Sequence, residues 1–145
     1  MELFSEYFEK LLLKQPDYFE NGLIKGAYLI GAYSKGIIDS SYNPNGKVVK
    51  KNETFKKWLS TKRITESNLK AIFNKATYFE KLFSLNTPKN NDLSQLVTTY
   101  FIYPKNIRVA QQEISFAFIK GFNDYAKFKK ENQKQGEDNE WVGKA

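Results

Sequence analysis

Apolar residues recur at helical spacing along most of this chain. The pattern is clearest after Thr65, a residue type that caps helix N-termini well. One helix face there collects six apolar side chains: Leu69, Ile72, Phe73, Ala76, Phe79 and Phe83. No segment of useful length alternates apolar and polar residues between hairpin turns, as a half-buried strand would. The sequence therefore predicts an all-α protein, a single bundle of about five to six helices.

Turn and capping residues divide the chain into six helical segments. They are expected near residues 2–15, 21–42, 53–60, 65–83, 92–103 and 106–130. Pro16 and Pro104 end the first and fifth segments, and Asn91 is the expected cap of the fifth. A chain of 145 residues fits one domain, which we place at 1–130. The polar residues 131–145 are expected to form a disordered tail.

Two of these segments contain similar glycine motifs. Tyr28-Leu29-Ile30-Gly31 resembles Phe118-Ile119-Lys120-Gly121, and each glycine falls in mid-helix. A mid-helix glycine costs about 1 kcal/mol relative to alanine, so a structural reason is expected. Close approach of two helices is the simplest one. Gly22 and Gly26, which share a helix face, indicate either a tight crossing inside the bundle or a flat surface for a neighbouring subunit.

The composition narrows the chemistry. The chain has no cysteine and no histidine, which excludes disulfides, thiolate metal sites and the usual proton shuttle at neutral pH. The carboxylates are scattered without a recognisable pairing, so we expect no catalytic residues, no metal site, no cofactor and no enzymatic activity. The N-terminal residues do not resemble a signal peptide, and no apolar stretch approaches the ~20 residues of a membrane span. We therefore expect a cytoplasmic protein.

Positive charge is concentrated in residues 47–63. The whole chain has a net charge of +7, and this window alone carries +6. Its basic residues are Lys47, Lys50, Lys51, Lys56, Lys57, Lys62 and Arg63. Lysine suits phosphates better than base edges, so this window favours contact with a nucleic-acid backbone with little sequence specificity. The alternative is a solvated loop that Phe55, Trp58 and Leu59 anchor to the core. In either case we expect the rings of Phe55 and Trp58 to pack inward and not to stack on bases.

The fourth segment offers a second basic feature. Lys70, Asn74, Thr77 and Lys81 fall in a narrow stripe opposite its apolar face. This stripe is either an ordinary solvated face or a continuation of the basic window.

The sixth segment is apolar over much of its circumference. One stripe includes Ile114, Ala117, Gly121 and Tyr125, while Phe116, Ile119 and Phe122 lie on other faces. Such a helix is either central in its own core or buries one stripe against a partner. Phe116, Ile119 and Phe122 are therefore the candidate subunit-interface residues.

Three blocks resemble the C-terminal helical domain of the large subunit of type I-B CRISPR effector complexes (Cascade). The segment GAYLIGAY at 26–33, extending to Ile38, resembles that domain's aliphatic–Leu–Gly helix. FKKWL at 55–59, followed by Arg63-Ile64 and LKAIF at 69–73, resembles its next part. ISFAFIKG at 114–121 resembles its final helix.

In that family the same domain also occurs as a separate small subunit. The resemblance implies a non-catalytic protein whose copies lie in a row beside other CRISPR effector subunits. It would contact the backbones of guide RNA and target DNA, in the heteroduplex or the displaced strand, and stabilise the opened duplex. The alternative is a helical protein–protein interaction module without a nucleic-acid role.

Overall fold

The computed structural model describes residues 2–40, 53–83, 85, 87–101 and 109–144, with side chains described as far as residue 132. Within these ranges the chain forms six helices and no strand, which confirms the predicted all-α bundle. The helices are α1 (Phe4–Lys14), α2 (Gly22–Asp39), α3 (Glu53–Ser60), α4 (Glu66–Leu82), α5 (Pro88–Tyr100) and α6 (Gln111–Lys144).

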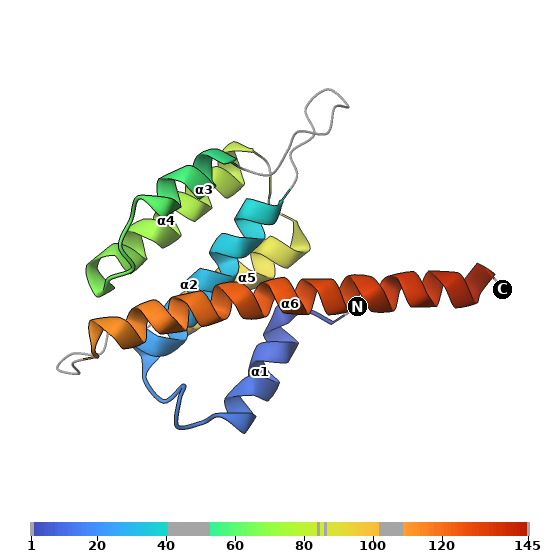
Figure 1. Ribbon diagram of the computed structural model, residues 1–145, viewed down its shortest axis with the longest axis horizontal. Coiled ribbons are helices and arrows are strands. Elements are labelled where there is room, and N and C mark those ends of the chain that lie inside the picture. Colours follow the sequence, from blue (N-terminus) through green and yellow to red (C-terminus); the bar gives the residue numbers. More distant parts are fainter. Residues whose placement is uncertain (1, 41–52, 84, 86, 102–108, 145) are drawn as a thin grey trace.

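Helix α2 is the centre of the bundle. Most of its residues are buried, and it contacts α3, α4, α5 and α6. Figure 1 shows α6 crossing α2, with α1 on one side of α6 and the α3–α4 pair on the other. A helix that is apolar on nearly every side must be enclosed by other helices, and α2 satisfies this condition.

The two glycine motifs pack against each other where α2 crosses α6. A Cβ atom on Gly31 would collide with the carbonyl oxygen of Phe118, and one on Gly121 would collide with the carbonyl oxygen of Tyr28. These neighbours are backbone atoms, which cannot move aside as a flexible side chain can. The expected close approach of two helices is therefore confirmed. Gly26 also lies inside the bundle, against the ring of Phe101.

Aromatic residues attach α1 to this crossing. Tyr28 of α2 lies within ring-contact distance of Phe8 and Phe19, at 5.7 and 5.1 Å between centroids. The Tyr28 hydroxyl donates a 2.7 Å hydrogen bond to Asp124 of α6. Burial, reinforced by this hydrogen bond, raises the pKa of Tyr28 well above its usual value. The hydroxyl therefore stays protonated and keeps donating to the carboxylate.

Helices α3 and α4 form a pair that rests on the other end of α2. Phe55 of α3 is fully buried, and its ring lies 5.6 Å from that of Phe79 on α4. Tyr33 of α2 packs its ring 5.7 Å from Phe73 and donates a hydrogen bond to the buried carboxyl of Glu80. One aromatic cluster thus holds both helices.

Several helix boundaries differ from the sequence prediction. The expected cap of the fifth helix at Asn91 is wrong, because α5 begins at Pro88 with Thr87 as its cap. The Thr87 hydroxyl accepts from the amide of Asn90, and proline suits the first helical turn, where its missing N–H costs nothing. The second helix ends at Asp39, earlier than predicted, with Ser40 as its C-cap.

Helix α6 extends beyond the predicted segment. It begins at Gln111 and continues to Lys144, through residues 131–144 that we expected to be a disordered tail. The side-chain amide of Asn132 donates a 3.3 Å hydrogen bond to the backbone carbonyl of Glu2, so the helix still contacts the rest of the bundle there. Glutamate, glutamine and lysine are good helix formers, and lengthening an existing helix avoids the cost of a new nucleus.

Candidate nucleic-acid interface

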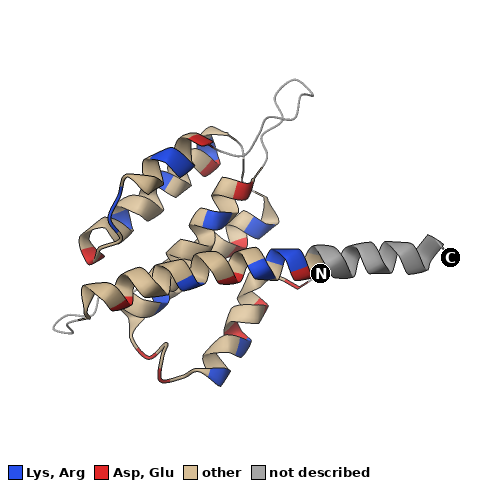
Figure 2. Ribbon diagram, in the orientation of Figure 1, with Lys and Arg blue, Asp and Glu red and all other residues tan. Residues whose placement is uncertain are grey.

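Basic side chains gather on the α3–α4 pair. Residues 53–83 contain seven basic and three acidic residues. One of the three acids, Glu80, is only 5% exposed and does not offset the surface charge directly. Figure 2 shows the basic positions distributed over both helices and the turn that joins them. The pair therefore presents a positive surface, which we call the α3–α4 face.

The structure places the predicted basic residues as follows. Lys47, Lys50 and Lys51 lie outside the described residues. The remaining predicted residues are all exposed on the α3–α4 face: Lys56, Lys57, Lys62, Arg63, Lys70 and Lys81. The second half of the basic window and the fourth-segment stripe thus lie on the same pair of helices.

Local capping shapes the turn between α3 and α4. The Thr65 hydroxyl accepts a 3.2 Å hydrogen bond from the amide of Asn68, as expected for an N-cap. The Asn68 side chain in turn donates to the carbonyl of Arg63 at 2.9 Å. These bonds fix the short segment that carries Lys62 and Arg63.

The aromatic residues of α3 pack toward the protein, as the sequence predicted. Phe55 is buried, and Trp58 is half-buried with its ring 6.1 Å from that of Phe55. The Nζ atoms of Lys62 and Lys75 lie 5.2 and 5.5 Å from the Trp58 ring centroid. Cation–π attraction at this distance holds both ammonium groups near the ring.

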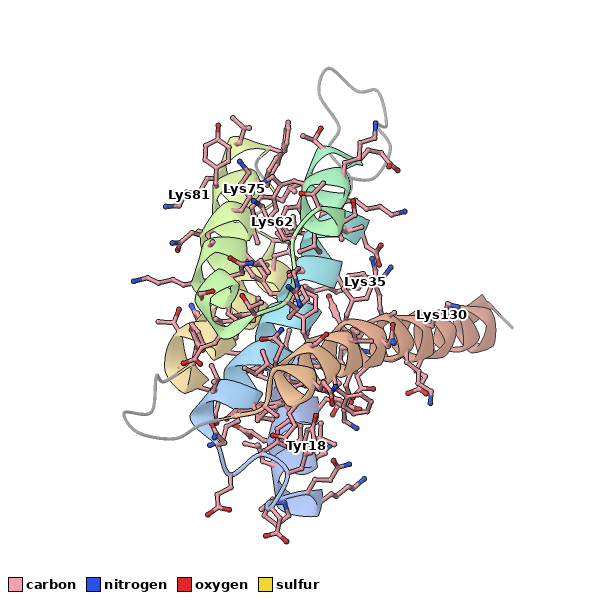
Figure 3. The ribbon with its side chains drawn as sticks, turned by 60° about the vertical axis from the view of Figure 1, so that its left-hand side comes forward. Tyr18, Lys35, Lys62, Lys75, Lys81 and Lys130 are labelled. Atoms are coloured by element: carbon pink, nitrogen blue, oxygen red, sulfur yellow. The ribbon has the colours of Figure 1, made fainter. Side chains whose placement is uncertain are left out.

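The sequence analysis missed Lys75 and Tyr78. Lys75 lies within 5.7 Å of the ring centroids of Trp58, Tyr78 and Phe79. Tyr78 is 55% exposed. Figure 3 shows Lys62, Lys75 and Lys81 on the α3–α4 side, away from Tyr18 and Lys130. Lys75 and Tyr78 flank the apolar stripe of α4. Only the position of α3 shows that Lys75 meets Trp58.

The expected polar stripe of α4 forms a row along the helix. Lys70, Asn74 and Lys81 are exposed, whereas the hydroxyl of Thr77 is half-buried and donates to the carbonyl of Phe73 at 2.9 Å. Lys70 and Lys81 are eleven residues apart, which at the α-helical rise corresponds to about 16 Å. That separation is close to the axial rise of about five base-pair steps of a duplex.

A cleft lies beside this row, between α4 and α5. Its volume is about 290 Å³, and the described residues that line it are Lys70, Phe73, Asn74, Val97, Thr98 and Phe101. Phe73, Val97 and Phe101 are apolar, whereas Lys70, Asn74 and Thr98 are polar and exposed. The cleft therefore combines an apolar surface with a polar rim.

The candidate subunit-interface residues lie on α6. Phe116 and Ile119 are 62% and 51% exposed and lie three residues apart on the helix. Phe122 is only partly exposed, and Lys35 places its Nζ atom 5.2 Å from the Phe122 ring centroid. Phe116 also borders a cleft of about 570 Å³, together with Tyr18, Ile24 and Glu113.

Other site types find little support in the described ranges. Among those residues no group of three or more acidic side chains is placed to hold a metal ion. None of the helices described there combines the length and apolar character that a bilayer crossing requires. Comparisons with protein-family models, curated proteins and solved structures found no match. Interpretation therefore depends on the geometry of the α3–α4 face and on the sequence resemblance.

Proposed function

We propose that this protein is a non-catalytic subunit that binds a nucleic-acid backbone through its α3–α4 face. The proposal rests mainly on one observation. Two helices and their connecting turn gather exposed lysines, whereas they contain only three acids, of which Glu80 is buried. Lysines on such a surface neutralise phosphates and release bound counterions, which supplies sequence-independent affinity. The scarcity of arginine, two residues in the chain, agrees with weak base specificity.

The sequence resemblance suggests the setting for this activity. We propose that the protein is the small subunit of a CRISPR RNA-guided complex of type I-B. In this role base pairing reads the target, and protein lysines hold the backbones of the opened strands. Copies in a row would place successive α3–α4 faces along the guide, and Phe116 and Ile119 are candidates for contact with neighbouring subunits.

A charge-reversal experiment tests the assignment of the face. The test variant carries Lys56→Glu, Lys57→Glu, Lys70→Glu and Lys81→Glu. The control carries the same charge change on exposed lysines elsewhere: Lys14→Glu, Lys89→Glu, Lys127→Glu and Lys130→Glu. Fluorescence anisotropy with labelled RNA, DNA and an RNA–DNA heteroduplex measures affinity. We expect the test variant to lose binding and the control to retain most of it; equal loss in both would mean that net charge alone is responsible.

The salt dependence gives a second measure of the same contacts. If one protomer meets about four to six phosphates, log affinity falls with log salt with a slope of roughly −3 to −5. A slope near zero would contradict backbone binding.

The proposed assembly requires a separate experiment. The protein is co-expressed with a tagged type I-B guide-RNA complex, which is then purified and weighed by native mass spectrometry. Several copies per guide RNA support the small-subunit role. An intact complex that lacks the protein would reject that role without affecting the binding result above.

The exposed apolar residues of α6 favour a second candidate function. Phe116 and Ile119 beside the 570 Å³ cleft suit contact with another protein, so the chain could be an interaction module whose lysines only keep it soluble. Such a module would bind its partner nearly independently of moderate salt and would show no affinity for the labelled nucleic acids.

A further inference from the structure

The cleft between α4 and α5 contains groups that a phosphate-binding surface does not need. Phe73 and Phe101, both partly exposed, line the cleft together with the buried Val97, while phosphate contact requires only the lysines, of which Lys70 stands at its rim. Its volume of about 290 Å³ is too small for a helix but large enough for one flat ring system. A ligand that uses the whole cleft must therefore be partly apolar.

The rim of the cleft selects among partly apolar ligands. Asn74 offers an amide that both donates and accepts hydrogen bonds. The Thr98 hydroxyl donates to the carbonyl of Ser94 at 3.0 Å, which leaves its oxygen able to accept. Lys70 adds a positive charge, and none of the described residues that line the cleft is acidic. A nucleobase attached to a phosphate supplies a flat ring, polar edges and a negative charge together.

A paired base cannot use this cleft, because its ring faces are stacked and its Watson–Crick edge is occupied. An unpaired base has both faces free, and protein sites for single strands stack such bases on aromatic rings beside basic grooves. The row of Lys70 and Lys81 leads past the cleft opening, so a strand lying on the row brings its bases next to the opening.

We propose that the α4–α5 cleft receives one unpaired base of a single strand whose phosphates lie along Lys70 and Lys81. This inference rests on the proposed function and sharpens it, because it assigns the α3–α4 face to a single strand in preference to a duplex. Phe73 and Phe101 contact the ring of the base, and Asn74 and Thr98 contact its edge.

Abasic oligonucleotides test this proposal directly. A labelled single-stranded DNA is compared with the same strand in which every base is removed and every phosphate kept, and with the corresponding duplex. We expect the base-bearing strand to bind roughly five-fold or more tightly than the abasic strand, as stacking of one base predicts, and more tightly than the duplex.

A blocking variant locates the effect in the cleft. Thr98→Phe fills the opening from an exposed position of α5, whereas Thr99→Phe adds the same ring at an exposed position that does not line the cleft. We expect Thr98→Phe to remove the preference for base-bearing over abasic DNA. Thr99→Phe should keep the preference, and far-UV circular dichroism verifies that both variants are folded.

The outcomes separate the two proposals. Equal binding of base-bearing and abasic strands would overturn the cleft inference and leave backbone binding intact. A preference that survives Thr98→Phe would also overturn it, because the base would then be held elsewhere. If strands, abasic strands and duplex all fail to bind, the proposed function fails and the inference fails with it.

Discussion

The α2–α6 crossing and the α3–α4 pair are both held by α2, but through different contacts. At the crossing the backbones meet, with Gly31 against the carbonyl of Phe118 and Gly121 against the carbonyl of Tyr28. The α3–α4 pair is instead held by side chains, chiefly through Tyr33, which contacts Phe73 and Glu80. One contact depends on the absence of side chains and the other on their presence.

This difference has a consequence for charge. Close backbone approach encloses α2 and the inner face of α6, where an unpaired charge would be costly to bury. Helices α3 and α4 expose most of their surface, so lysines there keep their hydration. Residues 1–40 accordingly have more acids than bases, six against four, whereas residues 53–83 have seven bases against three acids. The crossing provides the scaffold, and the pair carries the charge.

The largest expected effect comes from adding a side chain at the crossing. Gly31→Leu should destabilise the protein by about 3 kcal/mol or more, because the backbone of α6 cannot move aside. Urea unfolding followed by circular dichroism measures the change. Ala71→Leu, at an exposed position of α4, is the control and should change stability by less than about 0.5 kcal/mol. Similar stabilities of the two variants would contradict the backbone contact.

A smaller effect is expected where α2 holds α4 by side chains. Tyr33→Phe removes the donor to Glu80, which is 5% exposed and would lose this hydrogen bond inside the protein. The expected cost is about 1–3 kcal/mol. Tyr78→Phe, at an exposed tyrosine of the same face, serves as the control and should be nearly neutral in the same unfolding experiment.

Alkaline pH should lower the free energy of unfolding through the titration of Tyr125. Burial, and to a lesser degree Asp39 and Asp92, raises the pKa of this tyrosine to about 12, from an ordinary value of 10.0. Because the folded pKa is the higher one, its contribution is fully present below pH 10 and is lost as pH rises through about 12. Tyr125→Phe should therefore reduce the fall in unfolding free energy between pH 10 and 11 by about 1 kcal/mol. Parallel curves for the two proteins would contradict this.

The smallest effect on stability is expected on the α3–α4 face itself. Lys70→Gln with Lys81→Gln should change the unfolding free energy by less than about 0.5 kcal/mol, since both side chains are exposed. The same variant should reduce the magnitude of the salt slope for nucleic-acid binding by about 1.4 to 1.8. A large loss of stability would mean that these lysines support the fold, contrary to the division between scaffold and charged surface.

The sequence by itself determined the all-α class, most helix boundaries and the close approach at Gly31 and Gly121. These features follow from local rules: apolar spacing, capping residues, and the cost of glycine in mid-helix. It also located the basic residues of the α3–α4 face apart from Lys75, because charge density is visible without coordinates. The start of α5 was misplaced, although the Thr87-Pro88 capping signal was present in the sequence.

Only the tertiary structure decided which residues meet across helices. Lys75 lies against Trp58 of α3, and Phe73 shares a cleft with Phe101, because α2 holds α3, α4 and α5 around itself. Helical periodicity gives the face on which a side chain lies but not the partner that the face meets. That partner depends on how α2 is crossed and covered, and on contacts between residues far apart in the chain.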